Sequence, residues 1–255
     1  MTPEQFELFA KIEQEHWWFV ARRQIVRELL ERVAPAGRDT FAVDVGCGTG
    51  GNIAALANRF RCLGVDESDD AIALARARFP AVEFIRTGDL ATIEPQLARA
   101  GVVTCMDVVE HIEAAGPFLE QLVRSTRPGT QLLLTVPAGM ELWSEHDVTN
   151  GHVLRYTIEG FSALWSTLPV RVRLLSAFNA RLYPLVRATR AVSRMRGRAY
   201  GKAGTDFDIP PRVVNEALRR VFAGELPALR AAIDTPRRPY SRGVSVIALL
   251  ERTAG

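Results

Sequence analysis

The sequence predicts an α/β fold in which helices cover both faces of a mostly parallel sheet, and two observations support this. Short apolar runs rich in β-branched residues alternate with stretches of helical periodicity, which is typical of a sheet buried on both faces. The first of these runs leads into a glycine-rich turn, VDVGCGTGG at residues 43–51. Glycines at such a strand-to-helix turn allow the backbone to approach a ligand closely.

The individual elements follow from periodicity in chain order. Two helical stretches within residues 3–33 predict an N-terminal helical lid, residues 1–34. Strands are predicted at Phe41–Val45, Cys62–Val65, Val82–Ile85, Val102–Met106, Gln131–Val136, Val170–Phe178 and Val244–Leu250. Helices are predicted at Asn52–Arg59, Asp70–Arg78, Pro117–Thr126 and Thr157–Leu168. The sheet core would therefore span residues 41–178 and 242–250 of a single domain, 1–255.

The segment 179–241 is longer than an economical connection between two strands requires. We expect it to be a helical, basic insertion with helices over 181–198 and Val213–Ile233. The first of these is amphipathic and rich in arginine. Three interpretations stay open for it: peripheral contact with a membrane, a cover over a substrate pocket, or packing on its own domain.

Charge is distributed unevenly along the chain. Residues 1–170 carry 15 Lys and Arg against 23 Asp and Glu, whereas residues 171–255 carry 17 against 6. The basic part could face anionic lipid or a phosphorylated substrate, or form a solvated surface. We expect no nucleic-acid partner because no known RNA-binding module is present. The polar start and the lack of a long apolar run predict a cytoplasmic protein.

The cysteines are Cys47, Cys62 and Cys105, and they show no CxxC spacing. This pattern argues against a disulfide framework or a zinc site and predicts reduced thiols.

Acidic residues near the predicted strand ends distinguish between cofactors. Gly46, Gly48 and Gly51 also match GxGxxG, so a dinucleotide is possible on spacing alone. Asp44, two residues before the first glycine, suits the cationic amine of a ligand better than a pyrophosphate. Asp66 lies 22 residues further on, where a carboxylate can accept ribose hydroxyls. A further acid, Asp89, follows the third predicted strand in the motif TGDL at 87–90. Its carboxylate could accept a hydrogen bond from an adenine amino group.

These motifs resemble those of class I S-adenosylmethionine-dependent methyltransferases. The resemblance rests on VDVGCGTG (43–50), GVDES (64–68), TGDL (87–90), MDVVEHI (106–112) and RPGTQLLLTVP (127–137). It implies a Rossmann-like sheet of seven strands with the last antiparallel. A narrower resemblance, to bacterial methyltransferases of polysaccharide, lipid and natural-product pathways, rests on HWWF and LWSxHDxxxGHxxRYT.

The resemblance implies S-adenosyl-L-methionine as the cofactor and a set of residues to bind it. Three glycines would hold its methionine part, Asp66 its ribose and Asp89 its adenine. The cofactor-binding residues expected are Asp44, Gly46, Cys47, Gly48, Gly50, Asp66, Glu67, Gly88, Asp89, Leu90, Met106, Asp107 and His111.

The stretch WSEHDVTNGHVLRY, residues 143–156, follows the fifth predicted strand and is the predicted acceptor side of the site. Methyl transfer to a hydroxyl benefits from a base. His146 with Asp147 as its orienting partner is the first choice, and His152 is the competing base. Tyr156 completes the predicted catalytic set. We expect no metal, because the acids and histidines of this loop lack the helical spacing of the strongest zinc motif.

The acceptor is expected to be a small molecule, with an anionic or lipid-linked compound as one option, methylated on oxygen or nitrogen. Residues expected to contact it are His16, Trp17, Trp18, Trp143 and Arg155. The tryptophans could instead fasten the N-terminal helices to the sheet, and Arg155 could pair with an acid in its own loop. Other readings are carbon methylation of a prenyl or unsaturated acceptor, a nicotinamide-dependent oxidoreductase, a nucleic-acid methyltransferase and a non-catalytic binding scaffold.

Overall fold

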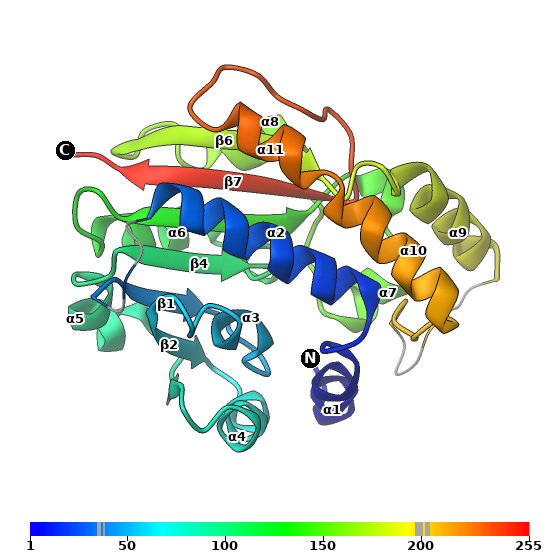
Figure 1. The fold of residues 1–255 in the computed structure, drawn as a ribbon, viewed down its shortest axis with the longest axis horizontal. Helices are drawn as coiled ribbons and strands as arrows, with labels where there is room; N and C mark the ends of the chain where they lie inside the picture. The colour runs from blue at the N-terminus through cyan, green and yellow to red at the C-terminus, as the bar shows by residue number, and fades with distance from the viewer. Residues whose placement is uncertain (35–36, 38, 197–200, 202–204, 255) are drawn as a thin grey trace.

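A single mixed sheet runs through the molecule, with helices on both of its faces (Figure 1). The computed structural model describes residues 1–34, 37, 39–196, 201 and 205–254. The strands are β1 (Phe41–Val45), β2 (Arg61–Asp66), β3 (Glu83–Arg86), β4 (Val102–Met106), β5 (Gln131–Pro137), β6 (Val170–Phe178) and β7 (Ser245–Arg252). Their order is β3-β2-β1-β4-β5-β7-β6, and β7 runs antiparallel to both β5 and β6. The predicted fold class is confirmed, including the antiparallel last strand.

Helices connect the strands and surround the sheet. The α-helices are α1 (Pro3–Ile12), α2 (Trp17–Val33), α3 (Gly51–Ala54), α4 (Asp69–Arg78), α5 (Glu94–Leu97), α6 (Ala115–Arg124), α7 (Glu145–Thr149), α8 (Ile158–Ala163), α9 (Tyr183–Arg196), α10 (Arg212–Ala223) and α11 (Leu226–Ala232). Three short 3₁₀ helices are η1 (Leu90–Ile93), η2 (Val109–His111) and η3 (Met140–Leu142).

Three predicted helices differ from the observed ones, and one of them is the helix predicted at Thr157–Leu168, which is observed as α8 and ends at Ala163. The helix predicted at Asn52–Arg59 is only α3, because the chain beyond it forms successive turns with i→i+3 hydrogen bonds. The helix predicted at Val213–Ile233 is divided into α10 and α11 at Gly224, since Pro227 in the first turn of α11 cannot continue a helix. The last two residues of the helix predicted at 181–198 lie outside the described residues.

The core forms one layer on each face of the sheet. Side chains alternate along β5, so Leu132 and Leu134 pack against one face while Leu133 packs against the other. The first layer includes residues of α5, α6 and α8. The second includes residues of α2, α3, α10 and α11. Cys47, Cys62 and Cys105 are buried and are free cysteines in the structure.

The N-terminal helices pack into the core and also contact the turn after β1. Helix α2 lies along one face, beside α10, and its apolar side is part of the core (Figure 1). Helix α1 reaches the turn after β1, where Glu13 accepts a hydrogen bond from Thr49 Oγ1 at 3.1 Å and pairs with Arg78. No helix in the described ranges is long and apolar enough to cross a membrane.

Phe222 connects the insertion to the core, and its replacement tests how strongly. The ring is fully buried and contacts Phe178 of β6 and Trp17 of α2 at centroid distances of 4.9 and 6.2 Å. We expect Phe222→Ala to lower the free energy of unfolding by about 3–5 kcal/mol, through lost burial and a cavity. Val213→Ala on the same helix, at a side chain 83% exposed, should change it by less than about 0.5 kcal/mol. Urea denaturation measures both, and equal effects would contradict this packing.

Candidate functional site

The turn after β1 brings the backbone close to open space. Gly46, Gly48 and Gly50 have φ values of 74°, 53° and 83°, which favour glycine. A Cβ at Gly46 or Gly50 would collide with Val108 or Phe84, whereas a Cβ at Gly48 would meet no atom within 4 Å. Gly46 and Gly50 are therefore needed for close packing of the turn, and Gly48 faces space that a ligand can occupy.

Asp44 lies beneath this turn and is only 1% exposed. Its Oδ1 accepts a hydrogen bond from Thr104 Oγ1 at 2.6 Å, while its Oδ2 has no hydrogen-bond partner among the described residues. Burial raises the pKa of Asp44 to about 7, against the opposing hydrogen bond from Thr104. A buried carboxylate with one free oxygen is suited to a cationic ligand group.

The predicted acids at the ends of β2 and β3 lie on neighbouring strands. Asp66 accepts hydrogen bonds from the backbone N–H groups of Gly48 at 2.8 Å and Ser68 at 3.0 Å. It therefore holds the glycine turn against β2. The exposed side chain of Glu67 lies against Gly88, where there is no side chain to displace it.

Asp89 and Leu90 follow β3 and have separate roles. The carboxylate of Asp89 is exposed and accepts from the backbone N–H of Ala91 at 2.9 Å, so it caps η1. Leu90 is 6% exposed and packs in the core. The side chain of Leu90 therefore has a structural role. Only one carboxylate oxygen of Asp89 is used in the cap, because Ala91 donates to Oδ1 alone.

The end of β4 is strained and charged. Asp107 has φ of 57°, a left-handed conformation that is uncommon for a residue other than glycine. Its carboxylate pairs with Arg22 of α2 at 2.7 Å and accepts a hydrogen bond from Thr135 Oγ1 at 3.0 Å. The side chain of Arg22 also lies 4.7 Å from the ring centroid of Trp18.

One cavity of about 670 Å³ joins the glycine turn to the predicted acceptor side. Its wall includes the predicted residues Gly46, Cys47, Gly48, Met106, Asp107, His111, His16, Trp17, Trp18, His146, His152 and Arg155. Sequence-distant segments therefore meet at the carboxyl ends of the parallel strands, as in other open α/β sheets.

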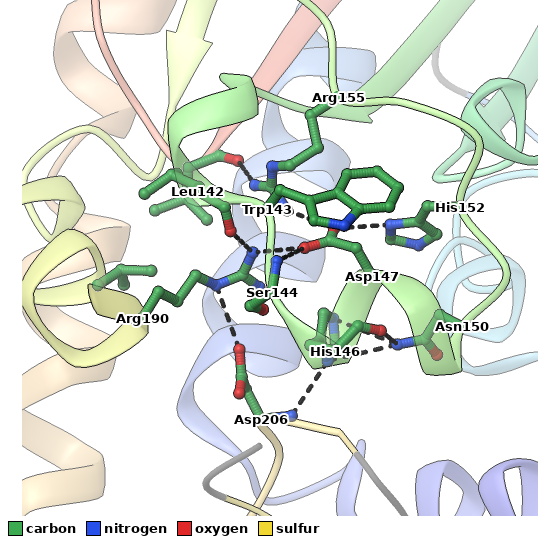
Figure 2. Close-up of polar contacts among 12 residues, drawn as sticks. Leu142, Trp143, Ser144, His146, Asp147, Asn150, His152, Arg155, Arg190 and Asp206 are labelled. Carbon is green, nitrogen blue, oxygen red and sulfur yellow. Dashed lines mark hydrogen bonds and ion pairs between the residues drawn. The ribbon is translucent and has the colours of Figure 1, made fainter. Parts of the chain in front are cut away.

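Asp147 is the centre of the acceptor side, as Figure 2 shows. The residue is 0% exposed, and its Oδ1 lies 2.8 Å from His152 Nδ1 and 2.7 Å from Arg155 Nη1. Its Oδ2 accepts from the backbone N–H of Ser144 at 3.0 Å and from Arg190 Nη1 at 3.1 Å. Burial opposes the charge, but the hydrogen bond with His152 and the two arginines hold the pKa of Asp147 well below its ordinary value.

The predicted pairing of His146 with Asp147 is wrong, because the Asp147 carboxylate orients His152 instead. His146 Nδ1 accepts a hydrogen bond from the backbone N–H of Asp206 at 3.0 Å, so its lone pair is already used (Figure 2). Burial, assisted by Arg190, also lowers the pKa of His146 well below its ordinary value. Both observations make His146 a poor base and leave His152 as the oriented imidazole.

Three predicted residues near this loop have structural surroundings. Tyr156 is 5% exposed and packs in the core against Phe161, outside the residues that line the cavity. Arg155 donates to the backbone carbonyls of Ala138 and Val244 as well as to Asp147, so pairing with an acid of its own loop is confirmed. Trp143 is half-buried, and its carbonyl accepts from Arg194 of α9.

The HWWF segment both fastens α2 and lines the cavity. His16 Nδ1 accepts from the backbone N–H of Trp18 at 3.3 Å, which caps the start of α2, and burial lowers the pKa of His16 to about 4. Trp17 packs in the core layer under α2 and donates its backbone N–H to Asn215 of α10. Trp18 contacts Phe207 at a centroid distance of 5.6 Å. The tryptophans can therefore fasten the N-terminal helices and also line the cavity, so the two predicted roles are compatible.

Sequence reasoning missed several residues that the fold brings into the site. Glu110 is 0% exposed, and neither carboxylate oxygen has a hydrogen-bond partner among the described residues. Burial, together with Asp107, raises the pKa of Glu110 well above its ordinary value. Glu110 precedes His111 in the motif MDVVEHI (106–112), so its position in the sequence could have marked it as a candidate site residue. Arg190 and Phe207 come from the insertion, where no local pattern marked them.

Removal of the Asp147 charge tests this network. We expect Asp147→Asn to lower the free energy of unfolding by about 3–5 kcal/mol, because Arg155 and Arg190 would stay buried without their shared carboxylate. Glu145→Gln, at an exposed position of the same helix, should change it by less than about 0.5 kcal/mol. Urea denaturation at neutral pH compares the two, and an Asp147 variant as stable as the control would contradict the network.

Comparison with known proteins relates part of this chain to methyltransferases. Residues 43–134 match the methyltransferase domain family. A probable S-adenosylmethionine-dependent methyltransferase of Mycolicibacterium smegmatis is 33% identical over 124 residues, which are 49% of this chain and 47% of that protein. Trans-aconitate 2-methyltransferase of Variovorax paradoxus is 31% identical over 123 residues, 47% of each. The chain thus spans about half the length of these curated relatives.

Solved structures share the fold at low sequence identity. A putative methyltransferase complexed with the Trm112 activator of Haloferax volcanii superposes with a TM-score of 0.58 at 16% identity, covering 100% of this chain and 99% of that one. The [4+2]-cyclase SpnF superposes with a TM-score of 0.59 at 16% identity, covering 93% and 83%. The solved structures share the fold, and the match over residues 43–134 supports the assignment of this part of the chain as a class I S-adenosylmethionine-dependent methyltransferase domain.

Proposed function

We propose that this chain transfers a methyl group from S-adenosyl-L-methionine to an oxygen or nitrogen atom of a small molecule, in a bacterial biosynthetic pathway. The observation that carries the proposal is the single cavity that connects the glycine turn after β1 with Glu110, His111 and His152. A cofactor seated at the turn and an acceptor held at these side chains would share this cavity. The family match over residues 43–134 supports the cofactor.

The residues around the turn fit this cofactor. The Oδ2 atom of Asp44, which has no hydrogen-bond partner among the described residues, is the proposed partner of the methionine ammonium group, and Gly48 faces open space. Asp66 and Glu67, at the end of β2, are the proposed ribose ligands, and Asp89 is the proposed adenine ligand. When bound, the cofactor supplies a sulfonium methyl group that is open to attack by a lone pair.

The acceptor side would position the attacking atom and handle its proton. In the transfer, the acceptor lone pair forms a bond to the methyl carbon, and the electrons of the broken carbon–sulfur bond stay on sulfur. A hydroxyl acceptor also loses its proton. His152 is the proposed catalytic residue because Asp147 holds its Nδ1, while its Nε2 forms no hydrogen bond with any residue that the structure describes. Asp147 would then be a positioning residue.

The cavity wall favours an acceptor with an apolar body. Aromatic and aliphatic residues from α1, α2, α9 and the 205–211 segment line much of it, among them Phe9, Trp18 and Phe207. Its described arginines each pair with a carboxylate: Arg22 with Asp107, and Arg155 and Arg190 with Asp147. A tricarboxylate such as trans-aconitate would therefore meet cations that are already neutralised.

Product identification tests the proposed function. The purified protein is incubated with methyl-labelled S-adenosylmethionine and an extract of its host, and labelled small molecules are identified by mass spectrometry. We expect a labelled methyl ether or methylamine together with S-adenosylhomocysteine. A labelled product with a new carbon–carbon bond would favour the carbon-methylating alternative, and the absence of any protein-dependent product would contradict the proposal.

Cofactor affinity should depend on pH through Asp44. Because burial raises the pKa of Asp44 to about 7, protons compete with the cofactor ammonium group, and affinity should fall by up to about tenfold per pH unit below pH 7. Titration calorimetry between about pH 5.5 and pH 8 measures this. Asp44→Asn should bind more weakly, with a flatter pH profile. Asp66→Ala should bind more weakly at every pH with the wild-type profile. An unchanged profile in Asp44→Asn would refute this role of Asp44.

The two loop histidines should differ in their effect on catalysis. With the acceptor identified above, we expect His152→Ala to lower kcat by about 10²-fold or more while cofactor affinity stays the same. His146→Ala should lower kcat by less than about tenfold, because its nitrogen accepts a backbone hydrogen bond and serves no acceptor group. Initial rates of S-adenosylhomocysteine formation compare them, and the reverse order would restore His146 as the base.

A further inference from the structure

Three side chains on the cavity wall converge without bonding to one another. Glu110, His111 and His152 each offer a nitrogen or carboxylate oxygen atom, and these atoms all lie within 4.8 Å of one another. The two imidazole rings have centroids 4.9 Å apart and meet at 77°. Glu110 is fully buried, and both of its oxygens lack a hydrogen-bond partner within the described part of the chain. Burial of an unpartnered carboxylate is costly unless a ligand compensates it.

The remaining ring nitrogens are fixed by hydrogen bonds. His152 Nδ1 lies 2.8 Å from a carboxylate oxygen of Asp147, and His111 Nδ1 lies 3.3 Å from the carbonyl oxygen of Gly151. Both oxygens act as acceptors, so each Nδ1 carries the hydrogen and each Nε2 keeps its lone pair. Metal-binding histidines in proteins typically have this arrangement, with the second nitrogen donating to a carboxylate or a backbone carbonyl.

We propose that Glu110, His111 and His152 bind a divalent transition-metal ion, of which Zn²⁺ and Mn²⁺ are the test cases. Two imidazoles and one carboxylate form a ligand set that such ions accept, and three protein ligands leave a coordination position open. This site differs from the acids and histidines of the 143–156 loop, for which the sequence predicted no metal, since only His152 belongs to both sets. It replaces the expectation that no metal is involved.

The ion deepens the proposed function, on which its role in the reaction depends. An acceptor hydroxyl bound at the open position would lose its proton to water more readily than in solution. The resulting oxygen lone pair then attacks the methyl carbon as the carbon–sulfur bond breaks. In the metal-loaded protein His152 would hold the ion and would not itself take the proton, so its loss would still lower kcat.

Metal binding tests the site without cofactor or acceptor. Protein stripped with a chelator and dialysed is titrated with Zn²⁺ by calorimetry, and with Mn²⁺ by the loss of the free-ion electron paramagnetic resonance signal. We expect one tight site, weakened by about 100-fold or more in Glu110→Gln, His111→Gln and His152→Gln. His146→Gln is the matched control, because His146 is a buried histidine of the same loop outside the trio; it should bind like the wild type.

X-ray absorption of the Zn²⁺-loaded wild-type protein keeps the proposal testable if the variants do not fold. We expect two imidazole ligands at about 2.0–2.1 Å. Wild-type protein that binds neither ion, trio variants that bind like the control, or a spectrum without imidazole scattering would overturn the site. A titration of the stripped protein with S-adenosylmethionine is independent, so failure of the metal site and failure of the proposed function can be distinguished.

Discussion

The acceptor side of the cavity depends on the buried carboxylate of Asp147. This one group joins α7 to Arg155 of the same loop, to Arg190 of α9 and to the imidazole of His152. Two arginines around one buried carboxylate carry a net positive charge, and Asp206 offsets it by pairing with Arg190 at 3.1 Å. Because each charge is buried only in the presence of its partners, the loop and the insertion must fold together. The orientation of His152 is a consequence of that folding.

The cavity is assembled from parts that serve the fold as well. Asp66 holds the glycine turn, Arg22 links α2 to the end of β4, and His16 caps α2. The basic helix α9 packs on η3 and lines the cavity with several apolar residues. Two of the three interpretations of this helix, a pocket cover and packing on its own domain, therefore apply together. One residue can therefore both stabilise the fold and line the cavity, so a structural role does not exclude a binding role.

The sheet and the identity of the cofactor could be predicted from the sequence, because each of their signals is local. The apolar pattern of each strand, the glycine turn and the acid at the end of β2 can each be recognised within a few consecutive residues. The acceptor half depends on contacts between distant segments. Asp147 pairs with His152 and not with its neighbour His146, since α7 points the two side chains in different directions (Figure 2). Similarly, no periodicity reveals that Glu110 is buried without a hydrogen-bond partner in the described ranges, or that Arg190 lies 43 residues away from the acid it binds.

In the proposed complex, one cavity places the cofactor methyl group against Glu110, His111 and His152. A crystal structure of the protein with S-adenosylmethionine and Zn²⁺ tests it most directly. We expect the cofactor ammonium group at Asp44, the methyl group directed toward these three side chains, and the ion bound between them. A methyl group directed toward another part of the wall, with Glu110 and the two histidines distant from it, would refute this arrangement.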